Sequence, residues 1–334
     1  MILRAAFIVS VIGVLFTPAA AQERVTVGTT RSVANGALFV AAAQGYFKAE
    51  GLDLAMTAYP SAQAVADALA LGATDFGLAA FTPAAFNLAG KGTIKAIAAQ
   101  AREQRDFEGN ELVASVAAYG RGLRKPEDLA GKSVAIDGLG LAFHYQLAQI
   151  ARIKRFDLAG VTLKPMGSLD AMARAVGAGE VDAAILPPQY ARDLLAAGQA
   201  RLIIWAAEID EPQLGALFTT TSTIAGKRAT VEKFLRAYRR GAADYAAALL
   251  RHDRYAKRLS DAKSQSVAAM IARYVYPGSA AAAIAKVEAD AYYMDSQARL
   301  DLDDLSRRIE WSKAQGLIDK NVEARDVVDL SFTK

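Results

Sequence analysis

One pattern occurs twice in this chain at a fixed distance. The stretches LGATDFGLAAF (71–81) and AGEVDAAILPP (178–188) both place a glycine, two further residues, an aspartate and then an apolar run. The equivalent residues lie 107 positions apart: Gly72 and Gly179, Asp75 and Asp182, Ser61 and Ser168. Any two βαβ units can look alike by chance, but three units in register favour a repeat. The repeat predicts two similar α/β lobes.

Both halves of the chain alternate between strand and helix patterns. Alternating β-branched residues predict a strand at 24–30, and apolar residues at helical spacing predict a helix at 37–50. The first half continues with expected strands at 52–59 and 75–81 around a helix at 61–72. The second half repeats this order, with strands at 131–138, 161–166 and 181–186 and helices at 141–156 and 169–179. The order βαβαβ implies parallel strands joined by right-handed crossovers.

The domain organisation follows from this repeat. The chain is expected to cross between the lobes twice, near 113–120 and near 213–221. From about Thr223 the sequence is mostly helical, so this part is expected to pack back on the first lobe. The predicted division is a discontinuous first lobe, 22–115 plus 218–334, and a second lobe, 116–217. Two crossings make a hinge, and ligands of open α/β sheets bind at the carboxyl ends of the strands.

The first 21 residues predict a secretory signal peptide. Arg4 is followed by an apolar run, 5–16, and by three alanines at 19–21, after which we expect cleavage. A membrane anchor is the alternative, but the run is shorter than the roughly 20 residues that span a bilayer. The chain has no cysteine for a disulfide or a lipid anchor. We therefore expect a protein of a bacterial periplasm, with outright secretion as the alternative.

The composition and motifs argue against several classes of partner and site. The net charge is +4, and the 39 lysines and arginines are scattered, which argues against a nucleic-acid partner. Two histidines are too few for an ordinary zinc site or catalytic triad, so no metal and no cofactor are expected. The stretch GLGLAF (138–143) is close to a dinucleotide-binding loop, but it lacks the third glycine, and no acid follows the next strand.

Several motifs resemble a known family. GYFKAEGLDL (45–54) resembles the GYF-x-x-EGL-D signature of periplasmic substrate-binding proteins of ABC importers, in the superfamily for nitrate, sulfonate, taurine and thiamine precursors. Further segments fit in order: LGATDFGLA (71–79), KPEDLAGKSVAI (125–136), AGEVDAAIL (178–186), TVEKFLRAY (230–238) and VVDLSF (327–332). The match covers nearly all of the mature chain, but most of its motifs are packing and turn residues.

The resemblance implies a fold and a role. The fold is the two-lobed periplasmic binding protein fold, type II-like, with a mainly parallel sheet and flanking helices in each lobe and two hinge crossings. The role is capture of a small molecule and its delivery to an ABC permease in the inner membrane, and a monomer is expected. The superfamily includes a thiamine-pyrimidine synthase, but that enzyme's cysteine-rich motif is absent here, so we expect no catalysis.

Candidate ligand contacts in the first lobe lie in the loops after its strands. The loop after the first strand offers hydroxyls, a guanidinium and the start of a helix, which favours negative charge. The residues expected to contact the ligand are Thr30, Arg31, Ser32, Asn35, Tyr59, Ser61, Phe81 and Thr82. Arginine holds planar oxyanions with two hydrogen bonds, although Arg31 could equally point into solvent. Arg102 is expected at the surface rather than in the site.

The second lobe offers an equivalent loop. Its expected contacts are Gly138, Gly140, Phe143, His144, Pro187 and Gln189. Many members of the family carry an acid before a proline where this chain has Pro187, Pro188 and Gln189. Without that acid, Arg31 and His144 favour a small organic anion with an apolar body, of the carboxylate or sulfonate type. The alternatives are a binding protein for a thiamine-precursor pyrimidine, held by aromatic stacking, and an extracytoplasmic sensor protein that serves a membrane receptor.

Overall fold

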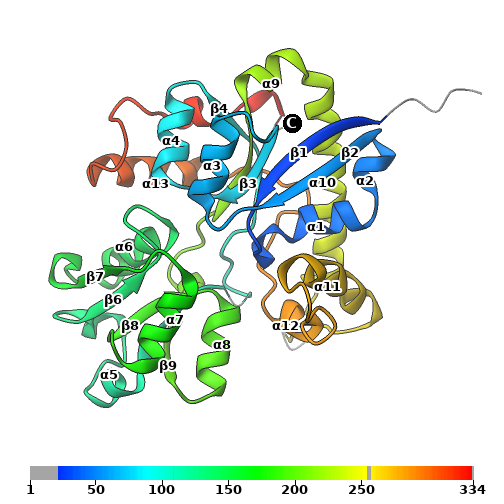
Figure 1. Cartoon of the computed structure of the whole chain (residues 1–334). Helices are drawn as coiled ribbons and strands as arrows, with labels where there is room; N and C mark the ends of the chain where they lie inside the picture. The colour runs from blue at the N-terminus through cyan, green and yellow to red at the C-terminus, as the bar shows by residue number, and fades with distance from the viewer. Residues whose placement is uncertain (1–21, 108, 254–256, 333–334) are drawn as a thin grey trace, which may run out of the picture.

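A computed structural model describes residues 22–332 apart from 108 and 254–256. The predicted signal peptide, 1–21, lies outside the described residues. Two five-stranded sheets flanked by helices form two lobes, one above the other in Figure 1. Within the described part of the chain, no helix combines the length and the apolar character that a membrane span needs. The predicted two-lobed α/β architecture is confirmed.

The first sheet has the strand order β2-β1-β3-β10-β4. Its members are β1 (Glu23–Thr29), β2 (Leu52–Ala58), β3 (Phe76–Ala80), β4 (Ile94–Ala99) and β10 (Gly215–Thr220). β1 pairs in parallel with β2 and β3, whereas β10 is antiparallel to both β3 and β4. Four strands therefore run in one direction and β10 runs against them.

The second sheet has the same plan, β7-β6-β8-β5-β9. It consists of β5 (Glu111–Ser115), β6 (Ser133–Ile136), β7 (Thr162–Pro165), β8 (Ala183–Leu186) and β9 (Ala200–Trp205). Here β5 is the antiparallel strand, between β8 and β9. Each lobe therefore gives its fifth strand to the sheet of the other.

This exchange shifts the boundaries from those that the sequence predicts. The predicted first lobe ends at 115, but β5 (Glu111–Ser115) pairs only with strands of the second sheet. Likewise β10 begins at Gly215, inside the predicted second lobe. The chain therefore crosses between the sheets over 100–110 and 206–214. An apolar strand such as β5 could pair within either sheet, so its sequence does not specify its partners.

The repeated aspartates make the same hydrogen bonds in both lobes. Asp75 Oδ2 accepts from the backbone N (2.9 Å) and Oγ1 (2.8 Å) of Thr26. Asp182 Oδ2 accepts from the backbone N and Oγ of Ser133, both at 2.9 Å. Each aspartate thus ties the first strand of its βαβαβ unit, β1 or β6, to the central strand of its sheet, β3 or β8. The glycines three residues earlier, Gly72 and Gly179, have positive φ of 71° and 76°.

The helices cover both faces of the sheets. Those of the first half are α1 (Gly36–Ala43), α2 (Tyr46–Ala49), α3 (Ala62–Ala70) and α4 (Pro83–Gly90). Those of the second lobe are α5 (Val116–Gly120), α6 (Ala142–Lys154), α7 (Leu169–Ala178) and α8 (Pro188–Ala196). Serine and threonine side chains cap several of these helices, which satisfies backbone N–H groups that lack helical partners.

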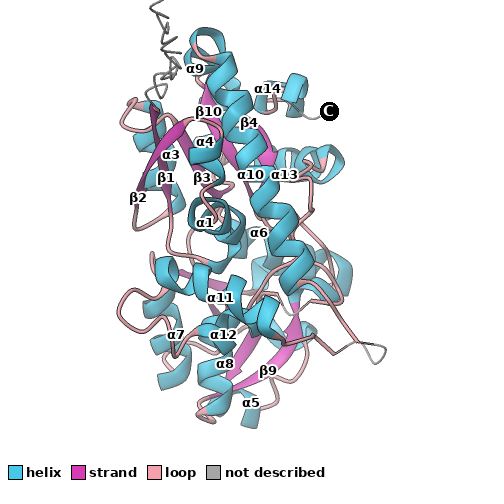
Figure 2. Ribbon diagram, turned by 90° about the vertical axis from the view of Figure 1, so that its right-hand side faces the viewer, coloured by secondary structure: helices cyan, strands magenta, loops and turns pink. Residues whose placement is uncertain are grey.

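The carboxyl-terminal third is helical, and much of it packs on the core of the first lobe. It contains α9 (Thr221–Gly226), α10 (Arg228–Leu249), α11 (Ala262–Val275), α12 (Ile284–Ala289), α13 (Leu302–Ala314) and α14 (Ala324–Val327). The long α10 runs beside the first sheet (Figure 2), and its apolar face joins that sheet's core. A Cβ at Gly241 would lie 2.3 Å from the Ala37 carbonyl oxygen, so α10 and α1 approach closely only because this residue is glycine.

Candidate functional site

The segments that follow β3 and β6 meet where the two lobes face each other. A Cβ on Gly140, in the second lobe, would lie 2.6 Å from Pro83 Cγ in the first. His144 of α6 lies edge-on to Trp311 of α13, with ring centroids 5.1 Å apart. Because ligands of open α/β sheets bind beyond the carboxyl ends of their strands, this meeting point is the candidate site.

A buried cation and an acid face each other at this point. Arg308 of α13 is 1% exposed, and its Nη2 donates to the Phe81 carbonyl oxygen at 3.1 Å. Asp137 follows β6 and accepts from the backbone N of Gly138 at 3.0 Å. Burial raises the pKa of Asp137 to about 7, although hydrogen bonds and the charge of Arg308 oppose the shift. Neither residue is among the contacts that the sequence predicts.

The loop after β1 satisfies most of its own polar groups. Asn35 Nδ2 donates to the Thr30 carbonyl oxygen (2.9 Å) and to Thr30 Oγ1 (3.0 Å), and Gln100 Nε2 donates to Asn35 Oδ1. Ser32 Oγ caps a short 3-10 helix by accepting from the Ala34 N at 3.2 Å. Arg31 is exposed and lies 3.4 Å from the Tyr274 carbonyl oxygen. The predicted role of Arg31 in binding an anion stays a prediction.

Two further predicted hydroxyls serve as helix caps. Ser61 Oγ accepts from the Ala64 N (3.2 Å) at the start of α3, and Thr82 Oγ1 accepts from the Ala85 N (3.0 Å) at the start of α4. A hydroxyl that accepts in this way still has its own proton to donate. Phe81 is buried and stacks on Phe86, with centroids 5.4 Å apart.

Tyr59 is the remaining predicted ligand contact of the first lobe. Its ring covers Gly28, where a Cβ would lie 3.0 Å from the Tyr59 Cε2. The ring is half-buried at the end of β2 and can still meet a solute.

In the second lobe, His144 supports its own loop. Its Nδ1 accepts from the Gly140 backbone N at 2.9 Å, and burial lowers the pKa of the imidazole. A neutral ring that accepts at Nδ1 carries no positive charge for an anion. Gly140 adopts φ +79°, and Phe143 is buried in the core of the second lobe. Gly138 donates to Asp137, as described above.

A second contact between the lobes involves α8, which begins after Pro187. Arg192 Nε lies 3.1 Å from Asp290 Oδ1, and Lys286 Nζ lies 2.6 Å from Asp193 Oδ2, so two ion pairs join α8 to the α12 region. Gln189 Oε1 is buried without a hydrogen-bond partner among the described residues. Pro187 is buried at the start of the helix. Asp290, the buried acid of this contact, comes from a segment about a hundred residues after α8.

The first crossing carries a buried polar network. Asn110 Nδ2 donates to Gln146 Oε1, Gln146 Nε2 donates to Glu103 Oε1, and Tyr292 OH donates to Asn110 Oδ1, at 2.9, 2.9 and 2.7 Å. Burial raises the pKa of Glu103 to about 7, against the hydrogen bonds that it accepts. A Cβ on Gly109 would lie 1.6 Å from Glu103 Oε2, so only glycine fits beside this carboxyl. The network connects both lobes to the crossing.

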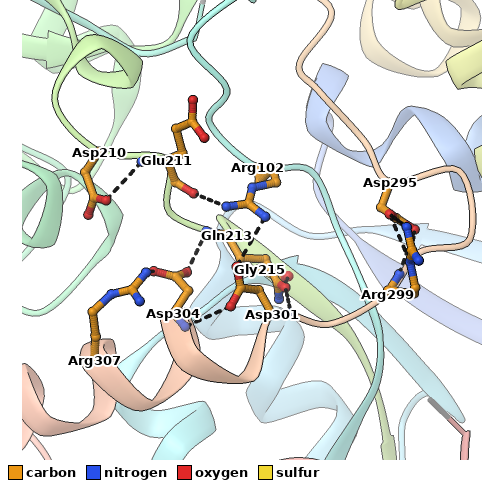
Figure 3. Close-up of polar contacts among 10 residues, drawn as sticks. All are labelled: Arg102, Asp210, Glu211, Gln213, Gly215, Asp295, Arg299, Asp301, Asp304 and Arg307. Carbon is orange, nitrogen blue, oxygen red and sulfur yellow. Dashed lines mark hydrogen bonds and ion pairs between the residues drawn. The ribbon is translucent and has the colours of Figure 1, made fainter. Parts of the chain in front are cut away.

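A cavity of about 580 Å³ lies beside the crossings, on residues of 99–104 and 293–303 together with Gln213. Arg102 is one of the lining residues, and Figure 3 shows it donating to the Glu211 carbonyl oxygen (2.7 Å) and to Asp301 (3.3 Å). Arg102 also hydrogen-bonds through its backbone to Tyr293. Arg102 therefore joins both crossings to the carboxyl-terminal segment. Its side chain is partly exposed, and its contacts are structural.

Metal ligation finds no support in the described part of the chain. Among residues 22–107, 109–253 and 257–332, no group of three or more histidine, aspartate and glutamate side chains could hold a metal ion.

Three residues at the lobe contacts lie outside the sequence prediction for one reason, and Asp137 for another. Arg308, Trp311 and Asp290 come from the helical third, which carries no repeat and no loop at a strand end. Asp137 is adjacent to a predicted strand, and its position 107 after Thr30 was the available signal.

Solved structures with this fold include several solute-binding proteins. The periplasmic aliphatic sulphonate binding protein SsuA from Escherichia coli is 13% identical, with a TM-score of 0.69 over 92% of each chain. The alkanesulfonate-binding protein SsuA from Xanthomonas axonopodis pv. citri, bound to MOPS, is 18% identical, with a TM-score of 0.68 over 92% of this chain and 99% of that chain.

An enzyme shares the fold. DszB, a desulfurization enzyme also solved as a cysteine-to-serine mutant with biphenyl-2-sulfinic acid, is 14% identical in that mutant form, with a TM-score of 0.61 over 93% of this chain and 98% of that chain. A search of curated protein sequences finds no match. A family model described as NMT1/THI5 like matches residues 34–248, which is more than half of the chain. With its two-lobed fold and this match, the chain belongs to the NMT1/THI5-like family.

Proposed function

We propose that this protein is the periplasmic solute-binding component of an ABC importer, and that it captures a small organic anion between its lobes. The observation that carries the proposal is the meeting of two sheets of identical topology at the carboxyl ends of β3 and β6. A solute held there touches both lobes, so binding and lobe closure are coupled.

Closure supplies the signal for delivery. A ligand can shift the equilibrium between open and closed forms only by its difference in affinity for them. Contacts from both lobes create that difference, because the open form offers only one set of them. The closed, liganded form is the one that docks on the permease in the inner membrane.

The anionic class of the ligand has two supports. The E. coli and Xanthomonas neighbours are described as sulfonate-binding proteins, one of them bound to MOPS. In this chain, an arginine stands buried beside the carboxyl end of β3. Carboxylates and sulfonates accept charge-assisted hydrogen bonds from such a group.

We propose binding without turnover. Most of the neighbours are binding proteins, although DszB is an enzyme. The DszB mutant replaces a cysteine, whereas this chain contains none. Release of a product from any bound solute would contradict this part of the proposal.

A thermal-shift screen of the mature protein tests the proposal. The panel contains butanesulfonate, MOPS, aliphatic and aromatic carboxylates, nitrate, amines and pyrimidines. A ligand at 100 times its Kd stabilises the folded state by about 2.7 kcal/mol, which the assay detects. Stabilisation by sulfonates or carboxylates supports the proposal, and stabilisation by pyrimidines alone favours a thiamine-precursor binding protein. Adjacent genes for a permease and an ATPase support the importer, and a kinase gene favours a sensor.

A further inference from the structure

We propose that Arg308 is the residue that binds the anionic group of the ligand. The inference rests on the proposed function and deepens it, because it names the cation that selects the substrate class. Arg308 lies in α13, outside the segment that the family model matches.

The position of Arg308 is that of a ligand contact. Its Nη2 binds the carbonyl oxygen of Phe81, the first residue after β3 in the first lobe. Its guanidinium lies 5.0 Å from the ring centroid of Tyr145, in the second lobe, and 5.5 Å from that of Phe81. The charge therefore stands between the two lobes, at the strand ends where α/β sheets bind solutes.

The guanidinium has donors to spare. Arginine carries five N–H donors. The described residues give Arg308 one hydrogen-bond partner, and its Nε is buried without any. A buried charged group without partners is costly, so an oxyanion that accepts from Nε and from an Nη gains a binding site already made.

The neighbouring acids do not accept from the remaining N–H donors of Arg308. Both oxygens of Asp304 accept elsewhere, from the Gln213 backbone N at 2.7 Å and from Arg307 at 3.1 Å. Asp137 acts on Arg308 through its charge but forms no ion pair with it among those found in the described chain. A planar carboxylate or a sulfonate can accept from Arg308 Nε, which has no hydrogen-bond partner among the described residues.

Other arginines near the lobe contact are less suited. Arg192 pairs with Asp290, and Arg307 pairs with Asp304. Arg31 is exposed to solvent, where an ion pair contributes little. Tyr145 of the second lobe lies over the guanidinium, so parting of the lobes would expose Arg308 to a solute.

Calorimetry with butanesulfonate and MOPS tests the inference on the wild-type protein and on Arg308→Gln, Arg308→Lys and Arg228→Gln. We expect Arg308→Gln to weaken binding by about 10- to 100-fold, as expected for loss of a charged hydrogen bond, and Arg308→Lys to weaken it less. The matched control Arg228→Gln, an exposed position on α10 that pairs with Glu232, should change affinity less than about threefold. Equal affinity of the wild type and Arg308→Gln would overturn the inference.

The ratio of the affinities for a charged and an uncharged ligand distinguishes loss of the charge contact from a general loss of folding. Butanesulfonamide has the shape of butanesulfonate without its charge, so the wild type should prefer the sulfonate. Arg308→Gln should lose that preference, and Arg308→Lys should keep part of it if the glutamine variant does not fold. A preference that survives in the folded variant overturns the inference. If the wild type binds no sulfonate or carboxylate at all, the proposed function itself fails.

Discussion

At Gly140 the backbone of the second lobe touches the first lobe with no side chain between them. The residue also has a positive φ of 79°, a conformation that other L-amino acids adopt at a cost of roughly 1–2 kcal/mol. Gly131 has a similar φ of 71°, but a Cβ there would meet nothing within 4 Å. Comparing variants of the two glycines therefore distinguishes the cost of the local backbone conformation from the cost of a Cβ at the contact between the lobes.

Gly140→Ala should hinder closure, whereas Gly131→Ala should not. Both substitutions impose the backbone penalty, but only the first places a Cβ against Pro83 and Leu317. We expect both variants to melt at lower temperature and only Gly140→Ala to have a larger radius of gyration by X-ray scattering. A radius unchanged from that of Gly131→Ala would contradict the closed contact.

Glu103 should make stability depend on pH. Its pKa is raised from 4.5 to about 7 in the folded protein, so the folded state holds a proton that the unfolded state releases above about pH 4.5. The free energy of unfolding should then fall as the pH rises from about 4.5 to 7, by on the order of 3 kcal/mol at most.

Glu103→Gln removes this proton and keeps one oxygen to accept from Asn110 and Gln146. Asp137 and Asp290 have raised pKa values of about 7 and about 6 and act with the same sign, so the comparison must be with the wild type. In urea unfolding at pH 5, 6, 7 and 8, the stability of the variant relative to wild type should rise with pH. Parallel curves would exclude the effect.

At the scale of the elements, the two lobes repeat even their irregularities. The pairing of β5 with β9 shifts between Leu112 and Val113, and the pairing of β10 with β4 shifts between Leu217 and Phe218. Each exchanged strand also ends in a hydroxyl that caps the next helix, Ser115 before α5 and Thr220 before α9. The repeat therefore includes the exchanged strands as well as the βαβαβ units.

Asp75→Ala and Asp182→Ala should each loosen one lobe. Each change leaves a backbone N–H of the neighbouring strand without its acceptor, which costs about 1–3 kcal/mol. Hydrogen exchange should rise in β1 and β3 for the first variant, and in β6 and β8 for the second. Asp53→Ala, an exposed position on β2, is the control and should change neither. Equal loosening of both lobes by either variant would contradict separate sheets.

At the scale of the whole molecule, charge helps to hold the lobes together. The pair Lys286–Asp193 is partly exposed, so it should contribute about 0.2–1 kcal/mol to closure. Arg192–Asp290 is more buried on the acid side, and burial raises the pKa of Asp290 to about 6 even though Arg192 opposes the shift. Salt screens such pairs, since the Debye length falls to about 3 Å at 1 M.

Raising NaCl from 0.05 to 1 M should therefore open the lobes in a fraction of the molecules. Fluorescence energy transfer between one dye on each lobe measures this, and Asp193→Asn should reduce the salt effect. Arg228→Met breaks a pair with Glu232 inside α10 and is the matched control, with no expected change in the distance between lobes. A salt response that Asp193→Asn leaves intact would assign closure to the apolar contacts instead.

Much of this protein could be predicted from local sequence alone. The repeat of Gly72 and Asp75 in Gly179 and Asp182 indicates two lobes of one plan. In each half the aspartate bonds to the first strand of its own unit, so this contact depends on residues within that half. Helix and strand periodicity gave the order of the elements for the same reason. The loop residues at the strand ends followed from that order, although several of their hydroxyls cap helices.

The tertiary structure alone decided the partners of β5 and β10 and the place of Arg308. A buried apolar strand has the same sequence pattern in either sheet, so its partners depend on how the two lobes pack together. Arg308 comes to β3 from α13, more than two hundred residues later in the chain. Contacts at such separation depend on packing of the whole helical third, which no local pattern encodes.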